Sequence, residues 1–517
     1  MSSKNIQHAA DANFARETVR YTTGTGGQLI INIQRMSDSF LSTRLNQATS
    51  RNAADSSAYQ STSQIDKLIT SSTMTSEGKY ENLLQSSITQ MSSSWDGLLV
   101  KDTPSARKSI IADLDQVRIN INDMANSLQQ QQKLINNQIK ASTDESNEIL
   151  KQVAELNDLI SKTDPGDTLN DLLNKQSALI YDLSVHLDIN SRFSNDGTAR
   201  IELKSGMTLV DGKKYRDIEV GSSEFSNDYS IFVNGKKVSD NPELLGGTVG
   251  GQLMVRDGEL AEAQRKLGLM SASMVNVYNN ANRQGFTADG EKGKDILTPI
   301  TAGALSSSNN IGDSNLFIKI NPDDTKQLTA EPLKVVKTPT GYEVYNNNSD
   351  TLISSFSDLP LKVNGMEISL STGVVMAGDE FLIDPLRVAA SKFEVIAGPD
   401  DIAISANHPV VSGDNGNIQN FISARDEKIM FNGTATISEG LATIYVDISI
   451  NSATALSRMQ TSKSIHDSAS GEWGAYSGVN LEEERISLLG YEKNYQAASK
   501  IVQSSQKMWS SILDVIG

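Results

Sequence analysis

The sequence contains no cysteine among its 517 residues. A chain without cysteine forms no disulfide, carries no thiolate nucleophile and offers no thiolate ligand to a metal ion. The four histidines, His8, His186, His408 and His466, are scattered, and no two have the short spacing of a metal-binding helix. We therefore predict no metal site, no cofactor and no catalytic residue, and we expect these histidines to be solvated or to pack in a core.

Long apolar runs and an excess of positive charge are also missing. No run of about eighteen apolar residues is present, which is the length that spans a bilayer. The N-terminal MSSKNIQHAADANFARE lacks the apolar centre of a secretory signal. The net charge of −17 argues against nucleic acid and against an anionic membrane surface as partners. We expect a chain that is cytosolic or is exported without a cleaved signal peptide, with no membrane insertion.

The composition that remains is that of a folded, multi-domain protein. Hydrophobic residues make up 38% of the chain, charged residues 21% and aromatic residues only 5%. A length of 517 residues corresponds to roughly two to four domains. Few aromatic residues and many small polar ones favour thin helical layers over one large core.

Helical periodicity dominates the first third of the chain. Ser37 or Asp38 can cap a helix, and helical character continues with interruptions to about Leu187. Before this helical region, the brief run QLIINIQ predicts a strand that follows a turn at Gly26-Gly27. Within the helical region, Asp164-Pro165-Gly166-Asp167 predicts a turn. Long helices lying side by side would form a rod. The apolar stripe of the longest helical stretch includes Ile110, Leu114, Val117, Ile121, Leu128, Leu134 and Ile139.

Two later stretches alternate with the period of β-strands. In 188–240, Asp196-Gly197, Asp211-Gly212 and Asn234-Gly235 separate alternating runs, which predicts hairpins. Residues 315–398 contain short β runs divided by Pro, Gly and Asn, which predicts a sandwich or barrel-like insert. The intervening GGTVGG, residues 246–251, fits neither a dinucleotide loop nor a P-loop, so we expect a flexible start to a helix.

The C-terminal region carries the strongest functional signal. A helix is predicted from Ile437 to about Ile465, then a loop at SASGEWGAYSGVN, and then a final helix capped by Asn480 with Glu483 completing a capping box. On that final helix, apolar residues repeat at heptad spacing, with Glu484 and Ser505 as polar interruptions. The resulting seam consists of Leu481, Leu488, Tyr491, Tyr495, Ala498, Val502, Trp509, Ile512 and Ile516.

This seam requires a partner. Burying six of its large side chains would contribute on the order of 10 kcal/mol, whereas a single amphipathic helix is marginal in water. One possibility is that the helix docks on its own domain. The preceding SGVN favours an exposed arm instead, and we predict that the seam forms an intersubunit core.

Five stretches of the sequence carry a resemblance to a known family. The C-terminal one is SGVNLEEE with LLGYEKNYQAASKIVQSSQKMWSSIL. The other four are IQRMSDSFLSTRLNQA, GGTVGGQLMVRDGELAEAQRKLG with NRQGFTADGEKGKDIL, MEISLSTGVVMAGDEFLIDPLR, and SGDNGNIQNFISARD. Together, and in this order, they resemble the flagellar hook-associated protein 1 family, the first of the two hook–filament junction proteins, whose closing helix is shared with hook and rod proteins. The N-terminal helix of the family is largely missing, and Ala12-Asn13-Phe14 replaces its usual Pro-Gly-Tyr.

The resemblance implies a structural subunit at the hook–filament junction, which is needed for filament attachment. Its implied partners are other copies of itself in a ring, the hook protein, the second junction protein, and an export chaperone on the C-terminal helix. Its implied location is the extracellular flagellum, reached by export without a cleaved signal peptide. The alternatives are another axial flagellar protein, such as the second junction protein or a flagellin, and a secreted enzyme that uses two carboxylates.

These observations predict an α+β protein: an elongated multi-domain rod of long helices with inserted β hairpins, a β-rich domain and a C-terminal coiled-coil-type helix. The expected segments are 1–30 as a remnant of an axial segment, 31–187 as the first rod part, 188–240 as β hairpins, 241–310 as a rod helix, 311–400 as the outer β domain, 401–475 as the last rod part, and 476–517 as the axial helix.

Overall fold

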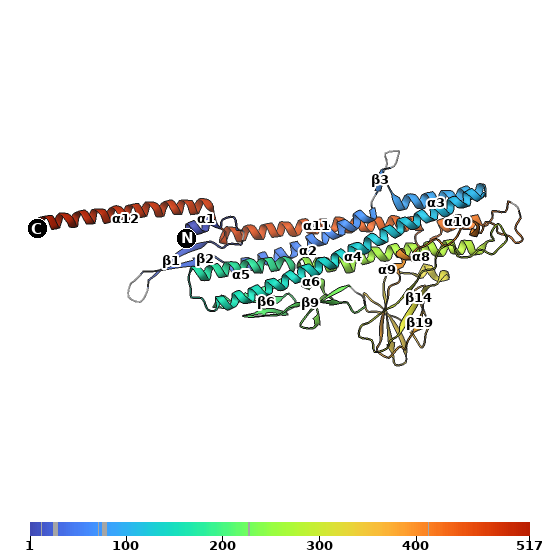
Figure 1. Ribbon diagram of the computed structural model, residues 1–517, viewed down its shortest axis with the longest axis horizontal. Coiled ribbons are helices and arrows are strands. Elements are labelled where there is room, and N and C mark those ends of the chain that lie inside the picture. Colours follow the sequence, from blue (N-terminus) through green and yellow to red (C-terminus); the bar gives the residue numbers. More distant parts are fainter. Residues whose placement is uncertain are drawn as a thin grey trace.

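The computed structural model describes residues 1–11, 13–23, 29–70, 72–74, 80–225, 228–411 and 413–516. Figure 1 shows an elongated rod of long helices, with most of the β structure along one side and one helix projecting from one end. The predicted α+β rod is confirmed. The predicted turn at Gly26-Gly27 lies outside the described residues.

Long helices lying side by side build the rod (Figure 1). The longest, α4, has 57 residues, which corresponds to about 85 Å at 1.5 Å per residue. α11 lies along α2, and α7 packs against both α2 and α4. The helices are α1 (Ser2–Gln7), α2 (Ser39–Thr70), α3 (Leu83–Val100), α4 (Pro104–Ile160), α5 (Asp167–His186), α6 (Pro242–Leu245), α7 (Gly247–Val255), a π-helical turn (Arg256–Leu260), α8 (Ala261–Gln284), α9 (Leu386–Ala389), α10 (Ile418–Asp426), α11 (Ile437–Ser477) and α12 (Leu481–Ile516).

One apolar stripe along α4 holds the rod together. Ile110, Leu114, Val117, Ile121 and Leu128 are fully buried, as their spacing predicts. Leu134 is the exception, because it is 54% exposed and Ile135 takes the buried position. Ile135 is seven residues after Leu128, so it stays on the stripe, whereas Leu134 is rotated by about 100°.

Small antiparallel sheets flank the first half of the rod. The predicted hairpins in 188–240 are confirmed, and Gly197, Gly212 and Gly235 take the positive φ angles that their turns require. The strands of this part are β1 (Glu17–Thr23), β2 (Leu29–Arg35), β3 (Ser72–Met74), β4 (Tyr80–Asn82), β5 (Ile189–Phe193), β6 (Ala199–Leu203), β7 (Thr208–Asp211), β8 (Lys214–Tyr215), β9 (Ile218–Ser222), β10 (Tyr229–Val233) and β11 (Lys236–Lys237). The β1–β2 pair includes residues 29–34 of the predicted QLIINIQ strand.

The predicted β insert forms two antiparallel sheets beside the rod (Figure 1). One has the order β12-β14-β19-β18 and the other β13-β20-β15-β16-β17. Ile318, Val335 and Phe381 from these sheets are fully buried, as in a sandwich-type core. The strands are β12 (Thr301–Gly303), β13 (Leu305–Ser306), β14 (Asn315–Ile320), β15 (Leu333–Thr338), β16 (Gly341–Asn346), β17 (Leu352–Phe356), β18 (Leu361–Val363), β19 (Met366–Thr372) and β20 (Glu380–Ile383).

The GGTVGG stretch is a close-packing point, which corrects the expected flexible start of a helix. A Cβ atom on Gly251 would lie 2.3 Å from the carbonyl oxygen of Ala54 on α2. A Cβ atom on Gly247, whose φ is +54°, would lie 2.2 Å from the carbonyl carbon of His186. These glycines let α7 approach α2 and the end of α5 more closely than any side chain permits.

The prediction of a loop at SASGEWGAYSGVN, residues 468–480, is wrong over most of this stretch, because α11 continues as a helix to Ser477. Ala469 and Trp473 are four residues apart and share one helix face, where they pack with Leu45 and Ala48 of α2. Burial of this pair offsets the roughly 1 kcal/mol that each of Gly471 and Gly474 costs inside a helix. Only Gly478, Val479 and Asn480 separate α11 from α12.

Candidate assembly interface

The projecting helix α12 begins at a well-defined cap. Asn480 Oδ1 accepts hydrogen bonds from the backbone N–H groups of Glu482 at 3.0 Å and Glu483 at 3.3 Å, as predicted. Glu483, which the sequence assigned to the reciprocal capping bond, instead accepts a hydrogen bond from Arg16 Nη1 at 3.0 Å. This bond ties the first turn of α12 to the N-terminal segment.

A buried polar joint connects α1 to the base of α12. Asn5 Nδ2 donates to Glu484 Oε1 at 2.9 Å and to the carbonyl oxygen of Glu17 at 2.9 Å, while the Glu17 N–H donates to Asn5 Oδ1 at 3.0 Å. Asn5 and Glu17 are sealed from solvent, and Glu484 is 7% exposed. Glu484 therefore belongs to this joint, although heptad spacing places it as a polar interruption of the seam.

We expect Asn5→Leu to loosen the base of α12. The change removes the side-chain donor to Glu484 and leaves a buried carboxylate without it, which costs on the order of 2–3 kcal/mol. Hydrogen exchange should speed up in the first turns of α12 and stay unchanged in α4. If the backbone amides of Glu484 and its neighbours exchanged at the same rate in the Asn5→Leu variant and in the unaltered protein, this account of the joint would be contradicted.

Beyond this joint, the described side chains of α12 lie largely open to solvent. Exposed fractions of the large seam residues run from 41% for Leu481 to 76% for Tyr495. Ala498 is exposed as well, and Ile516 lies in the helix although its side chain is outside the described residues. The remaining seam residues within this range of exposure are Leu488, Tyr491, Val502, Trp509 and Ile512. The structure places the predicted seam on one continuous helix, and among the described residues the N-terminal segment contacts its base through Glu483 and Glu484.

A second apolar group on α12 was missed from the sequence. Ile486, Ile501 and Met508 are 64–70% exposed and lie outside the seam. Ile486 lies nearly opposite the seam, whereas Ile501 and Met508 directly precede Val502 and Trp509 and are rotated from them by about 100°. The seven-residue spacing of Ile501 and Met508 was the available signal. Leu489 and Leu513 add further exposed apolar surface. A helix with apolar side chains on two sides is suited to contact more than one neighbour.

An isolated helix of this kind is not expected to be stable in water. α12 has 36 residues, and most helical stability in proteins comes from packing an apolar face. Exposed contiguous apolar patches of this extent mark surfaces that associate with other proteins. We therefore take α12 as the candidate functional site.

The histidines lie apart from one another. His8 stacks on Phe14, His186 lies near Glu145, His408 contacts Phe286, and His466 lies between Tyr181 and Asp467. Within the described ranges, no group of three or more His, Asp or Glu side chains is placed to hold a metal ion. The same part of the chain contains no helix with both the length and the hydropathy of a membrane span.

Two family models match the sequence. Residues 62–297 match the model described as the helical domain of flagellar hook-associated protein FlgK. Residues 475–515, which contain α12, match the model of the C-terminal region of flagellar basal body rod FlgEFG proteins. The second match indicates that this helix is shared across several flagellar proteins.

Curated relatives align with nearly the whole chain. Flagellar hook-associated protein 1 of Salmonella typhimurium is 25% identical over 540 aligned residues, which cover 99% of this chain and 96% of the relative. The protein of the same name from Escherichia coli is 24% identical, with the same coverage of both chains.

A solved structure shares the fold. The flagellar hook junction protein FlgK from Burkholderia pseudomallei superimposes with a TM-score of 0.73 at 17% sequence identity. The match covers 83% of this chain and 99% of that structure. The rod with its inserted β structure is therefore a known architecture.

Proposed function

We infer that this chain belongs to the flagellar hook-associated protein 1 family and is a structural subunit of the bacterial flagellum, located at the junction between hook and filament. The family likeness runs over 99% of the chain and includes both the rod and α12. The observation that carries the proposal is the long helix α12, whose apolar seam is exposed at one end of the rod.

The proposed mechanism divides the molecule into two working parts. α12 and the N-terminal segment anchor the subunit in the axial tube, and the seam from Leu481 to Ile516 packs against helices of neighbouring copies. The rods lie side by side in a ring, and the β domain at 311–400 points outward. The ring joins the flexible lattice of the hook to the stiff lattice of the filament.

The partners are proposed from the family likeness. We propose that the chain contacts the hook protein on one side and the second junction protein on the other. Before assembly, an export chaperone covers the apolar face of α12, because an exposed amphipathic helix otherwise associates non-specifically. The protein travels out of the cell through the flagellar export apparatus without a cleaved signal peptide.

We propose no enzymatic activity for this chain. The function is proposed from the exposed seam of α12 and from the family likeness, and both point to a structural subunit. A second axial role, as the other junction protein or a flagellin, is less well supported because the matching model is that of the helical domain of hook-associated protein FlgK.

Deleting the gene tests the proposal. We expect electron microscopy to show bare hooks, and immunoblots to show flagellin shed into the medium. Restoring the gene on a plasmid should restore attached filaments. Normal attached filaments in the deletion strain would refute the junction role.

A further inference from the structure

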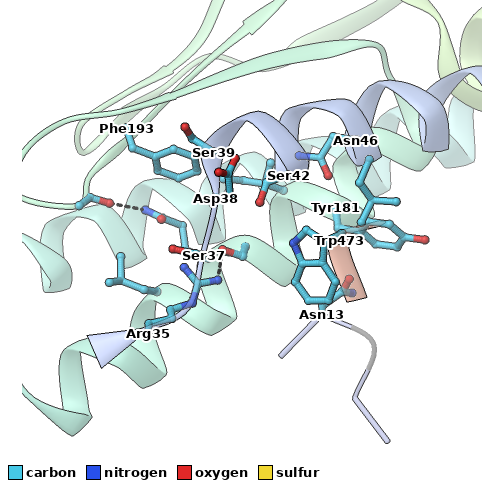
Figure 2. A pocket seen from close by; sticks show the side chains of 16 residues that line it. Asn13, Arg35, Ser37, Asp38, Ser39, Ser42, Asn46, Tyr181, Phe193 and Trp473 are labelled. Carbon is cyan, nitrogen blue, oxygen red and sulfur yellow. Dashed lines mark hydrogen bonds between the residues drawn. The ribbon is translucent and has the colours of Figure 1, made fainter. Parts of the chain in front are cut away.

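A cavity of about 300 Å³ lies at the end of the rod from which α12 projects. β2, α2, α5 and α11 contribute its walls (Figure 2). Figure 2 shows Arg35 on one side of the cavity, and Tyr181 and Trp473 on the opposite side. The volume far exceeds the roughly 30 Å³ that one water molecule occupies in the liquid, so a flexible side chain can enter.

The guanidinium of Arg35 lines this cavity. Among the described residues, it has no ion-pair partner. Its Nε donates to Asn174 Oδ1 at 2.7 Å and its Nη2 donates to Ser177 Oγ at 2.7 Å. Both acceptors are neutral, and a guanidinium has five N–H donors, so three remain. Burial lowers the pKa of Arg35 to about 10, so the group is still charged at neutral pH.

Among the described residues of the cavity wall, Asp38 is the one carboxylate, and it is already engaged. Its Oδ1 accepts hydrogen bonds from the backbone N–H groups of Phe40 at 2.8 Å and Leu41 at 3.0 Å, so it caps α2. A carboxylate at a helix N-terminus is balanced by the helix dipole. Arg35 thus remains a desolvated cation that neutral groups hold in place, and such a group gains from an added counter-charge.

We propose that the Arg35 cavity receives an acidic side chain from a neighbouring copy of this chain, namely Glu482 in the first turn of α12. The proposal rests on the self-assembly proposed above. Subunits in a ring are related by rotation, which brings features at the same level of two rods into contact. Trp473 in the cavity wall lies near the end of α11 and precedes Glu482, in the first turn of α12, by nine residues.

Glu482 is the carboxylate of this turn that is most available to a partner. Glu483 accepts a hydrogen bond from Arg16 and Glu484 accepts one from Asn5 within the same chain. The Glu482 side chain is 77% exposed, and its contact with Arg485 in its own chain is long, at 3.5 Å. A guanidinium with free donors matches a carboxylate in both charge and shape.

Charge reversal tests the pair in assembled flagella. We expect Arg35→Glu and Glu482→Arg each to lower the number of attached filaments per cell at least tenfold. The double variant should recover most of that loss. Asp467→Asn, at an exposed carboxylate on α11, is the matched control and should change nothing.

Crosslinking supplies a second readout, which does not depend on counting attached filaments. The chain has no natural cysteine, so Ser39→Cys at the cavity wall and Arg485→Cys beside Glu482 can be placed on two co-expressed copies. A short bis-maleimide should link these copies in isolated hook–filament preparations, and Glu482→Gln should reduce the linked dimer at least fivefold. Glu482→Gln leaves the bonds from Arg35 to α5 intact, so a folding defect does not mimic this result.

The outcomes separate this inference from the junction role. Bare hooks in the deletion strain, together with full assembly of both single charge variants and no crosslink, would overturn the Arg35–Glu482 contact alone. Arg35-dependent binding of free glutarate to the purified protein, without rescue in the double variant, would also overturn it, because the cavity would then serve a small dicarboxylate.

Discussion

Leu488→Asp or Val502→Asp is expected to leave the rod and the β domain folded and to stop incorporation of the subunit into the junction. Both side chains are about half exposed in the single chain, so the change costs little before assembly. In the assembled seam, a buried unpaired carboxylate costs several kcal/mol. At about 1.4 kcal/mol per factor of ten, this corresponds to at least a thousandfold weaker association.

The measurement is complementation of the deletion strain, with filaments counted by electron microscopy. Gln496→Asp introduces the same charge on α12 but away from the seam, and should assemble normally. A loss of solubility, or a lower unfolding temperature of the purified Leu488→Asp protein, would contradict the separation between the rod and the assembly helix.

Gly251→Val is expected to destabilise the rod itself. A Cβ atom at this position would lie 2.3 Å from the Ala54 carbonyl oxygen and 2.4 Å from Ser57 Oγ. The backbone of α2 cannot move aside without disrupting its packing on α7, so the free energy of unfolding should fall by about 3 kcal/mol or more. Calorimetry on the purified protein would measure the loss as a lower transition temperature of the rod.

Gly97→Ala is the matched control for this change. Gly97 lies inside α3, and a Cβ atom there would have nothing within 4 Å. Alanine should therefore stabilise the rod slightly, by up to about 1 kcal/mol through helix propensity. Equal destabilisation by both substitutions would show that close packing at Gly251 is not the cause.

Local signals in the sequence were sufficient for the main elements of the fold. Seven-residue and helical spacings indicated α4 and α12, and Asx-Gly pairs indicated the hairpins of 188–240. They were insufficient where tertiary contacts outweigh local preference. The stretch around Gly471 and Gly474 has the composition of a loop, yet Trp473 packs on α2 and keeps α11 helical to Ser477.

The candidate site was only partly predictable for the same reason. The seam follows from spacing along one helix. The joint of Asn5, Glu17 and Glu484 connects residues up to 479 positions apart, and such a contact cannot be predicted from a local sequence pattern. Arg35 likewise gives no signal in the sequence, because its lack of a counter-charge depends on what α5 and α2 place around it. The assignment of the seam to an intersubunit core stays a prediction.

Cryo-electron microscopy of native hook–filament junctions tests the central claim most directly. The account predicts a ring of this subunit between hook and filament, with α12 near the axis, its seam covered by helices of neighbouring copies, and the β domain on the outside. A ring in which α12 folds back on its own rod, or a junction that lacks this subunit, would contradict the account.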